Sequence, residues 1–204
     1  DTRAEIIQGA QQGNVEAVFE NAHDADSYNR TKEDAGKYVQ FILNTTGAAN
    51  ALLNIENTDQ SLAHHGVSVS TLAVALAKRL NMNDEKKIQL MALGALLHDY
   101  GHNIHPIDLG MPLTAMTPEN LKIWKEHPRV GAENVRNTKH FDPTVLNIIL
   151  QHEEKVNGTG PLKMLEKDQD PLATIVASAN TADRLLAFEK VPKADVPKKM
   201  TVDY

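Results

Sequence analysis

Apolar residues recur every three to four positions along most of the chain, which predicts helices and no strand of convincing length. In chain order the expected helices cover residues 4–22, 31–55, 59–80, 83–101 and 171–188, with further helix starts near residues 117, 128 and 142. Asp59 is the expected cap of the third helix. Pro128 and Pro143 stand where a first helical turn tolerates the missing N–H of proline. The pattern therefore predicts an all-α fold.

Two long segments lack this periodicity and are expected to be loops. Residues 103–117 and 157–170 are both interrupted by glycine and proline. The first of them is long enough to indicate a functional loop or a lid. We expect three regions: a leading helical extension over residues 1–57, a main domain over residues 58–190, and a loose, proline-containing tail over residues 191–204.

The composition limits the chemistry that the chain can support. It has no cysteine, so any metal must bind to histidine and carboxylate side chains, and a cytoplasmic location is expected. The net charge of -6 opposes broad DNA binding, which needs many basic residues on one face. No apolar run approaches the roughly 18 residues that a membrane span requires. Because the sequence starts at Asp1, we expect a further region upstream of it.

Four of the nine histidines stand at expected helix ends or beside breaks, separated by about one helix out and back. They are His65, His98, His127 and His152, and this spacing allows them to converge in one pocket. His98 is followed directly by Asp99 at the end of an apolar helix, which offers two metal ligands from one turn. A carboxylate buried there would be costly without a partner, and it could bridge two metal ions.

These residues resemble a known family. The segment His98–Gly101 resembles the HD signature of metal-dependent phosphohydrolases, and its surroundings resemble the HD-GYP branch, which cleaves cyclic di-GMP. His65 resembles the start of that branch's opening helix, Lys125–Pro128 its His-Pro segment, and His152–Pro161 its naming loop. The resemblance covers about residues 60 to 190. It implies an HD-domain helical bundle with a leading helical extension, and a metal-binding main domain.

The resemblance also implies a set of metal ligands. Carried over by position, these are His65, His98, Asp99, His127 and His152, with Glu153 where the family has a second histidine and Asn180 where it has an aspartate. Asp183 matches a second acidic position, and Ser61 stands where members with three metals carry a glutamate. We therefore expect two transition-metal ions, iron first and manganese second, because imidazole and carboxylate suit such ions. The implied chemistry is hydrolysis of a phosphodiester by water activated between two cations.

On the substrate side the chain departs from the family. Asp99 and His102 are the candidate catalytic residues, and His102 and Lys155 the candidate substrate-binding residues. His102 stands in place of a lysine, so a permanent charge becomes one that is partial near neutral pH. The naming tyrosine is missing, because Gly160 runs straight into proline. Glu189 appears near where the family has an arginine for the ligand, and a carboxylate there would repel phosphate.

Three hypotheses for function follow. The first is a phosphodiesterase of weak or altered activity on cyclic di-GMP or a similar cyclic or linear dinucleotide. The second is a catalytically degenerate domain that keeps its metal and passes a signal to a protein partner. The third is a phosphohydrolase with another substrate, because the HD chemistry does not dictate what is attached to the phosphorus. The leading helices are expected to connect to an upstream sensory or regulatory domain or to form a homodimer, unless they are simply an extension that packs on the core.

Overall fold

The helices begin where short polar side chains or prolines precede apolar runs. Asp84 accepts a hydrogen bond from the backbone N–H of Lys87, and Asp170 accepts one from Leu172. Ser61 accepts one from the backbone N–H of His64 and so caps the helix that carries His65. The predicted cap at Asp59 lies outside the described residues.

The computed structural model describes residues 2–55 and 61–203. The helices are α1 (Thr2–Glu20), α2 (Ala25–Asn44), α3 (Ala48–Leu53), α4 (Leu62–Arg79), α5 (Glu85–Leu97), α6 (Tyr100–Ile104), α7 (Pro118–Val135), α8 (Pro143–Gln151), α9 (Pro171–Asp183) and α10 (Val196–Asp203). A π-helix over Arg184–Phe188 continues α9, and three short 3₁₀ turns cover Leu113–Ala115, Glu166–Asp168 and Lys193–Asp195. Within the described ranges there is no strand, only an isolated bridge between Asn157 and Leu165, so the all-α prediction is confirmed.

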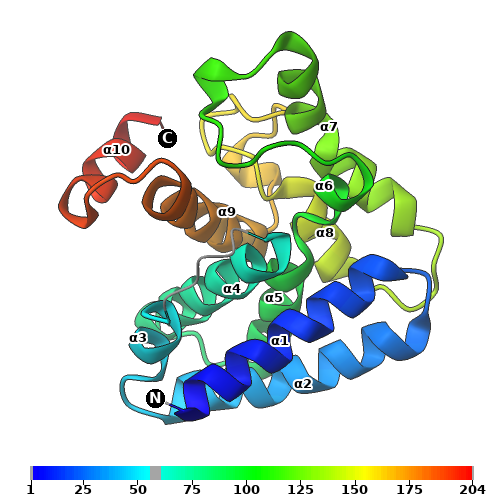
Figure 1. Ribbon diagram of the computed structural model, residues 1–204, viewed down its shortest axis with the longest axis vertical. Helices are drawn as coiled ribbons and strands as arrows, with labels where there is room; N and C mark the ends of the chain where they lie inside the picture. The colour runs from blue at the N-terminus through cyan, green and yellow to red at the C-terminus, as the bar shows by residue number, and fades with distance from the viewer. Residues whose placement is uncertain (1, 56–60, 204) are drawn as a thin grey trace.

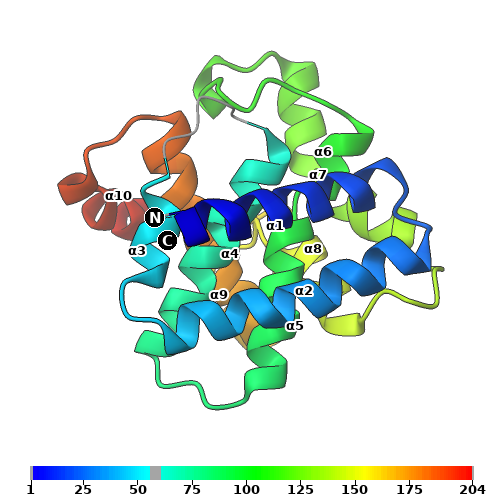
Figure 2. The ribbon, with the colours of Figure 1, turned by 60° about the horizontal axis from the view of Figure 1, so that its bottom comes forward.

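Helices α4, α5 and α9 form the centre of the bundle (Figure 1). Helices α1 and α2 run side by side and pack across α4 and α5, as both views show (Figures 1 and 2). One apolar core joins α2, α4, α5 and α9 through residues such as Val69, Met91 and Val176. Gly66 permits a close approach of α4 and α5, because a Cβ there would lie 2.4 Å from the carbonyl oxygen of Leu96. This contact brings the N-terminal turn of α4 against the C-terminal end of α5.

Several expected boundaries are wrong. Pro128 opens no helix but lies inside α7. The expected helix over residues 31–55 is broken after Asn44, and α3 starts behind Gly47, which has a positive φ of 78°. The tail is helical over Val196–Asp203, and Val196 is buried. In each case contacts from elsewhere in the fold, or a local left-handed residue, override the periodicity.

The expected division into three regions stays a prediction, and its first boundary, between residues 57 and 58, lies outside the described residues. No described helix combines the length and the apolar character that crossing a lipid bilayer demands.

Candidate metal centre

Two histidines of the site lie at the C-terminal ends of helices. His98 and His152 are the C-terminal caps of α5 and α8, where the last carbonyl groups of a helix have no helical partner. His98 donates from Nδ1 to the carbonyl oxygen of Ala95 at 2.6 Å, and His152 donates to that of Ile149 at 2.8 Å. A carbonyl oxygen only accepts, so the proton of each neutral ring is on Nδ1. Nε2 of each ring therefore presents a lone pair to the centre of the site.

His127 reaches the same state in the middle of a helix, and Pro128 makes this possible. Pro128 has no N–H to donate to the carbonyl oxygen of Trp124, four residues earlier. Nδ1 of His127 donates to that oxygen instead, at 2.5 Å. The proline that the sequence pattern assigns to a helix start thus frees the acceptor that orients His127. Position 101 likewise has to be a glycine, because a Cβ there would lie 1.9 Å from the carbonyl oxygen of His127.

Asp99 lies at the centre of the four imidazoles and faces all of them. Its Oδ1 is 3.2 Å from Nε2 of His127 and 3.3 Å from Nε2 of His152. Its Oδ2 is 3.3 Å from Nε2 of His98 and 3.4 Å from Nε2 of His65. Each carboxylate oxygen is therefore shared by two ring nitrogens, so that Asp99 lies between two pairs of imidazoles.

His65 is oriented by a carboxylate. Its Nδ1 is 2.7 Å from Oδ2 of Asp183, and its Nε2 is 2.9 Å from Oδ1 of Asn180. Such carboxylate-histidine pairs fix the tautomer of metal-binding histidines in other proteins. The amide of Asn180 is oriented in turn, because its Nδ2 donates to Oε1 of Glu153 at 3.0 Å. Asp183, the second acidic position of the sequence, thus lies behind His65 and does not face Asp99 directly.

The donor atoms of this cluster fit a divalent transition metal. Nε2 atoms of His127 and His152 lie 2.9 Å apart, although both rings carry their proton on Nδ1. Two lone pairs that face each other at this distance repel unless a cation lies beside them. Nε2 of His98 is buried and has no hydrogen-bond partner within the described ranges. Imidazole and carboxylate together are ligands that iron, manganese and zinc accept.

The geometry agrees with the comparison to known families. The sequence model of the HD domain family matches residues 62–187. The chain belongs to the HD domain family. Bd1817, a HDG"Y"P protein from Bdellovibrio bacteriovorus, has the same fold with a TM-score of 0.96 and 58% sequence identity, over 99% of this chain and 66% of that chain. The predicted membership of the HD-GYP branch, without its tyrosine, is therefore confirmed.

Curated relatives of this HD domain are longer proteins. It is 22% identical to cyclic di-GMP phosphodiesterase PA4108 of Pseudomonas aeruginosa, over 90% of this chain and 42% of that protein. It is 30% identical to cyclic di-GMP phosphodiesterase response regulator RpfG of Xanthomonas campestris pv. campestris, over 62% of this chain and 34% of that protein. The chain thus spans less than half the length of these relatives. The HD domain of L. monocytogenes phosphodiesterase PgpH, solved in complex with cyclic-di-AMP, shares the fold alone, with a TM-score of 0.51, 19% identity and coverage of 72% and 85%.

The electrostatics of this HD domain favour a charged Asp99. Burial raises the pKa of its carboxyl group, but the surrounding imidazoles of His98, His127 and His152 outweigh burial and hold that pKa well below its usual value. For Glu153 burial also raises the pKa, and the charge of Arg184 is the largest of the effects that more than reverse this. Both carboxylates are therefore ionised at neutral pH.

The histidines respond to burial in two ways. Burial lowers the pKa of His65, but its contacts with Asp183 and Asp99 raise it overall. Burial and the neighbouring His127 lower the pKa of His102 to about 3. His102 is 2% exposed and stacks on the His127 ring at a centroid distance of 3.7 Å. The expectation of a partial charge on His102 near neutral pH is therefore wrong, because the ring is neutral there.

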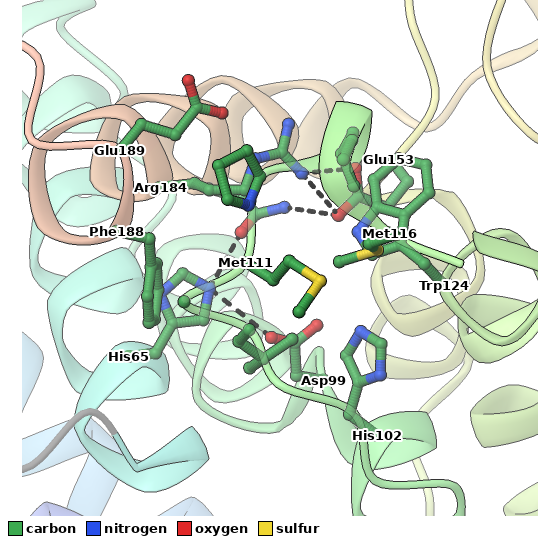
Figure 3. A pocket seen from close by; sticks show the side chains of 15 residues that line it. His65, Asp99, His102, Met111, Met116, Trp124, Glu153, Arg184, Phe188 and Glu189 are labelled. Atoms are coloured by element: carbon green, nitrogen blue, oxygen red, sulfur yellow. Dashed lines mark hydrogen bonds and ion pairs between the residues drawn. The ribbon is translucent and has the colours of Figure 1, made fainter. Parts of the chain in front are cut away.

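A cavity of about 30 Å³ opens above Asp99 (Figure 3). His65, Asp99 and His102 line it together with hydrophobic side chains from the loop between α6 and α7. That loop, expected to be functional, supplies Leu109, Met111, Pro112, Leu113 and Met116. Lys155 does not line this cavity but a neighbouring hollow. The structure thus gathers the predicted ligands and His102 in one place, and it sets Lys155 beside them.

Sequence reasoning missed three residues of the cavity wall: Trp124, Arg184 and Phe188. Arg184 donates to both oxygens of Glu153, at 3.5 and 3.4 Å, and lies 5.5 Å from the Trp124 ring centre. It follows Asn180 by four residues, so helical spacing alone places the two on one face. That spacing was the signal that could have found it. Phe188 packs edge-on against His65, at a ring distance of 5.4 Å.

Proposed function

We propose that this HD domain is a metal-dependent phosphodiesterase of the cyclic di-GMP type, with weak or altered activity. The observation that supports this most is Asp99, each of whose oxygens lies within 3.4 Å of two imidazole nitrogens. Two relatives that are named as cyclic di-GMP phosphodiesterases, and that extend well beyond this chain, add the substrate class. A cyclic dinucleotide, or a similar linear one, is the proposed substrate.

The residues divide into two ligand groups around Asp99. His65, His98, Asp99 and Asn180 would hold one ion, and His127, His152, Asp99 and Glu153 would hold the other. Two transition-metal ions are proposed, iron first and manganese second. When bound, they would lower the pKa of a water molecule and screen the negative charge of the phosphodiester.

The protein's own groups prepare the site for attack of water on phosphorus and cleavage of a P–O ester bond. Three backbone carbonyl groups hold the imidazole protons on Nδ1, so the Nε2 atoms remain available as ligands. Asp99 stays ionised, and His102 supports the face of the His127 ring without adding charge. The side chains of Met111, Met116 and Phe188 limit the access of bulk water. Lys155, in the neighbouring hollow, is the proposed substrate contact.

Two observations support weak activity and favour the alternative of a degenerate signalling domain. A cavity of about 30 Å³ holds roughly two water molecules, which is less than a phosphodiester needs, so the loop above it has to move. Glu153 is hydrogen-bonded to Asn180 and Arg184, which compete with a metal for it. The upstream sensory domain, the homodimer and the cytoplasmic location stay predictions.

The test is hydrolysis of cyclic di-GMP by protein purified without oxygen and loaded with iron or manganese. We expect slow, metal-dependent formation of the linear dinucleotide, detected by chromatography, and none from Asp99→Ala. If no metal-dependent product forms, the phosphodiesterase hypothesis is rejected and the hypothesis of a degenerate signalling domain remains. Rapid turnover would instead contradict the proposed weakness.

A further inference from the structure

A second, larger hollow adjoins the cavity over Asp99. Its volume is about 370 Å³, against about 30 Å³ for the cavity. The two share a wall, formed by Pro112, Leu113, Trp124, Glu153, Arg184 and Glu189. Sites for small molecules usually measure about 300 to 1,000 Å³. Any ligand larger than a few water molecules must therefore lie mostly in the hollow, with only its reacting end over Asp99.

The hollow carries a small excess of positive charge, although the chain as a whole carries a net charge of -6. Three cations line it, Lys155, Arg184 and Lys199, against the two carboxylates of Glu153 and Glu189, so its side chains sum to +1. The cations come from three separate elements: the segment after α8, the end of α9, and α10. Lys199 lies 3.2 Å from Glu189 and offsets the repulsion that the sequence led us to expect from that residue. A local excess of positive charge suits an anionic ligand.

Arg184 lies between the two spaces and is held in place from two sides (Figure 3). Its Nη1 is 3.4 and 3.5 Å from the oxygens of Glu153, longer than the roughly 2.7 to 2.9 Å of a good charge-assisted hydrogen bond. Its guanidinium group faces the ring of Trp124. The side chain is 21% exposed, so a ligand in the hollow can reach it. Arg184 is thus oriented, but its pairing with Glu153 is weak enough to be replaced.

We propose that Arg184 is the phosphate-binding residue of this site, and that it exchanges Glu153 for the phosphate of a nucleotide in the hollow. The guanidinium fork matches phosphate oxygens in a way that a neutral imidazole such as His102 does not. The exchange releases Glu153 toward the metal ligands His127 and His152. Phosphate binding and metal binding therefore strengthen each other. The inference rests on the proposed function for its substrate class, but it concerns binding and not turnover.

The first experiment measures anion binding to the metal-loaded protein by calorimetry, with inorganic phosphate and guanosine 5′-monophosphate as probes. Arg184→Met should weaken both by about tenfold or more, the size expected for a lost charged hydrogen bond. The matched control is Arg129→Met, which removes an exposed arginine of α7 that pairs with Glu133. It should leave both affinities unchanged. Trp124, the only tryptophan of the chain, provides a fluorescence signal for the same titration.

Arg184→Lys serves as a second variant that keeps the charge. Its affinities for both probes should lie between those of Arg184→Met and those of the unchanged protein. If Arg184→Met binds both probes as tightly as the unchanged protein does, the proposal is overturned. If Arg184→Met does not fold, the same comparison is made with Arg184→Lys. Failure of the unchanged protein to bind either probe would also overturn the proposal.

The second experiment separates this inference from the proposed function. Manganese affinity is measured with and without inorganic phosphate. Phosphate should tighten manganese binding in the unchanged protein and have no effect in Arg184→Met, whereas an equal effect in both contradicts the exchange. If Arg184→Met loses phosphate binding but cyclic di-GMP is never cleaved, the proposed function fails and the inference stands. If cleavage occurs and anion binding ignores Arg184, the inference fails alone.

Discussion

The hydrogen bond between Asn180 and Glu153 joins two positions that differ from the family, and it predicts that their effects depend on each other. The two side chains are largely buried and lie 3.0 Å apart. Asn180→Asp would place a second carboxylate at this distance, which costs roughly 5 kcal/mol at an effective dielectric constant of about 20. Arg184 offsets part of this cost. Adding Glu153→Gln exchanges the acid and the amide, so that one carboxylate again faces one amide.

The free energy of unfolding of the two single variants, the double variant and the unchanged protein is measured with denaturant and a metal chelator. We expect a coupling energy of about 2 to 3 kcal/mol, with the double variant more stable than the sum of its parts. His65, which also contacts position 180, is present in all four proteins and cancels. The control is Asn147→Asp, which faces Asp170 at 3.2 Å in an exposed pair and should cost less than about 1 kcal/mol. Additivity within about 0.5 kcal/mol would refute the reasoning.

Three further predictions concern the supports of the site. The pKa of His102 is about 3 in the folded protein, against 6.5 without the fold. Only the unfolded chain therefore binds a proton there as the pH falls below 6.5. The free energy of unfolding of the metal-free protein should therefore fall by about 2 kcal/mol between pH 7 and pH 5 through this group. In His102→Asn this part of the pH dependence should be missing from the denaturation curves. If the pH dependence is the same as in the unchanged protein, the lowered pKa of His102 is contradicted. Asp183→Asn removes the carboxylate behind His65 and should weaken metal binding about 10- to 100-fold in a chelator competition, whereas unaltered affinity would make the contact incidental. Gly101→Ala should lower the free energy of unfolding by about 3 kcal/mol or more, because its Cβ would collide with the α7 backbone. Gly13→Ala, which has open space around it, should be neutral or stabilising. Similar effects of the two substitutions in denaturation experiments would contradict the close approach at Gly101.

The convergence of the histidines was predictable because each one lies where a helix ends or a motif repeats the family's spacing. His98 and His152 cap their helices, and burying Asp99 demanded partners. The sequence could not predict that Pro128 lies inside α7, since the carbonyl group that it leaves free is satisfied by the ring of His127. Sequence rules for proline in helices do not consider that a side chain can donate to the carbonyl oxygen that the proline leaves without a partner.

The wall of the cavity was less accessible to sequence reasoning because it depends on contacts between distant elements. Glu189 suggested repulsion of phosphate, yet Lys199 from α10 lies 3.2 Å away, in a tail expected to be loose. Glu153 and Asn180 were treated as separate losses, although a hydrogen bond joins them and the pair keeps a single negative charge. Such compensation becomes visible only when the side chains are placed in space.

The metal content of protein purified without oxygen tests the metal centre most directly. Both ligand groups share Asp99, so Asp99→Ala should remove both ions together, whereas a change at one side alone, such as Glu153→Gln, should weaken one ion more than the other. Elemental analysis of the unchanged protein is expected to give about two transition-metal ions per chain, with iron ahead of manganese. Full metal occupancy in a correctly folded Asp99→Ala variant would contradict the assignment of this cluster.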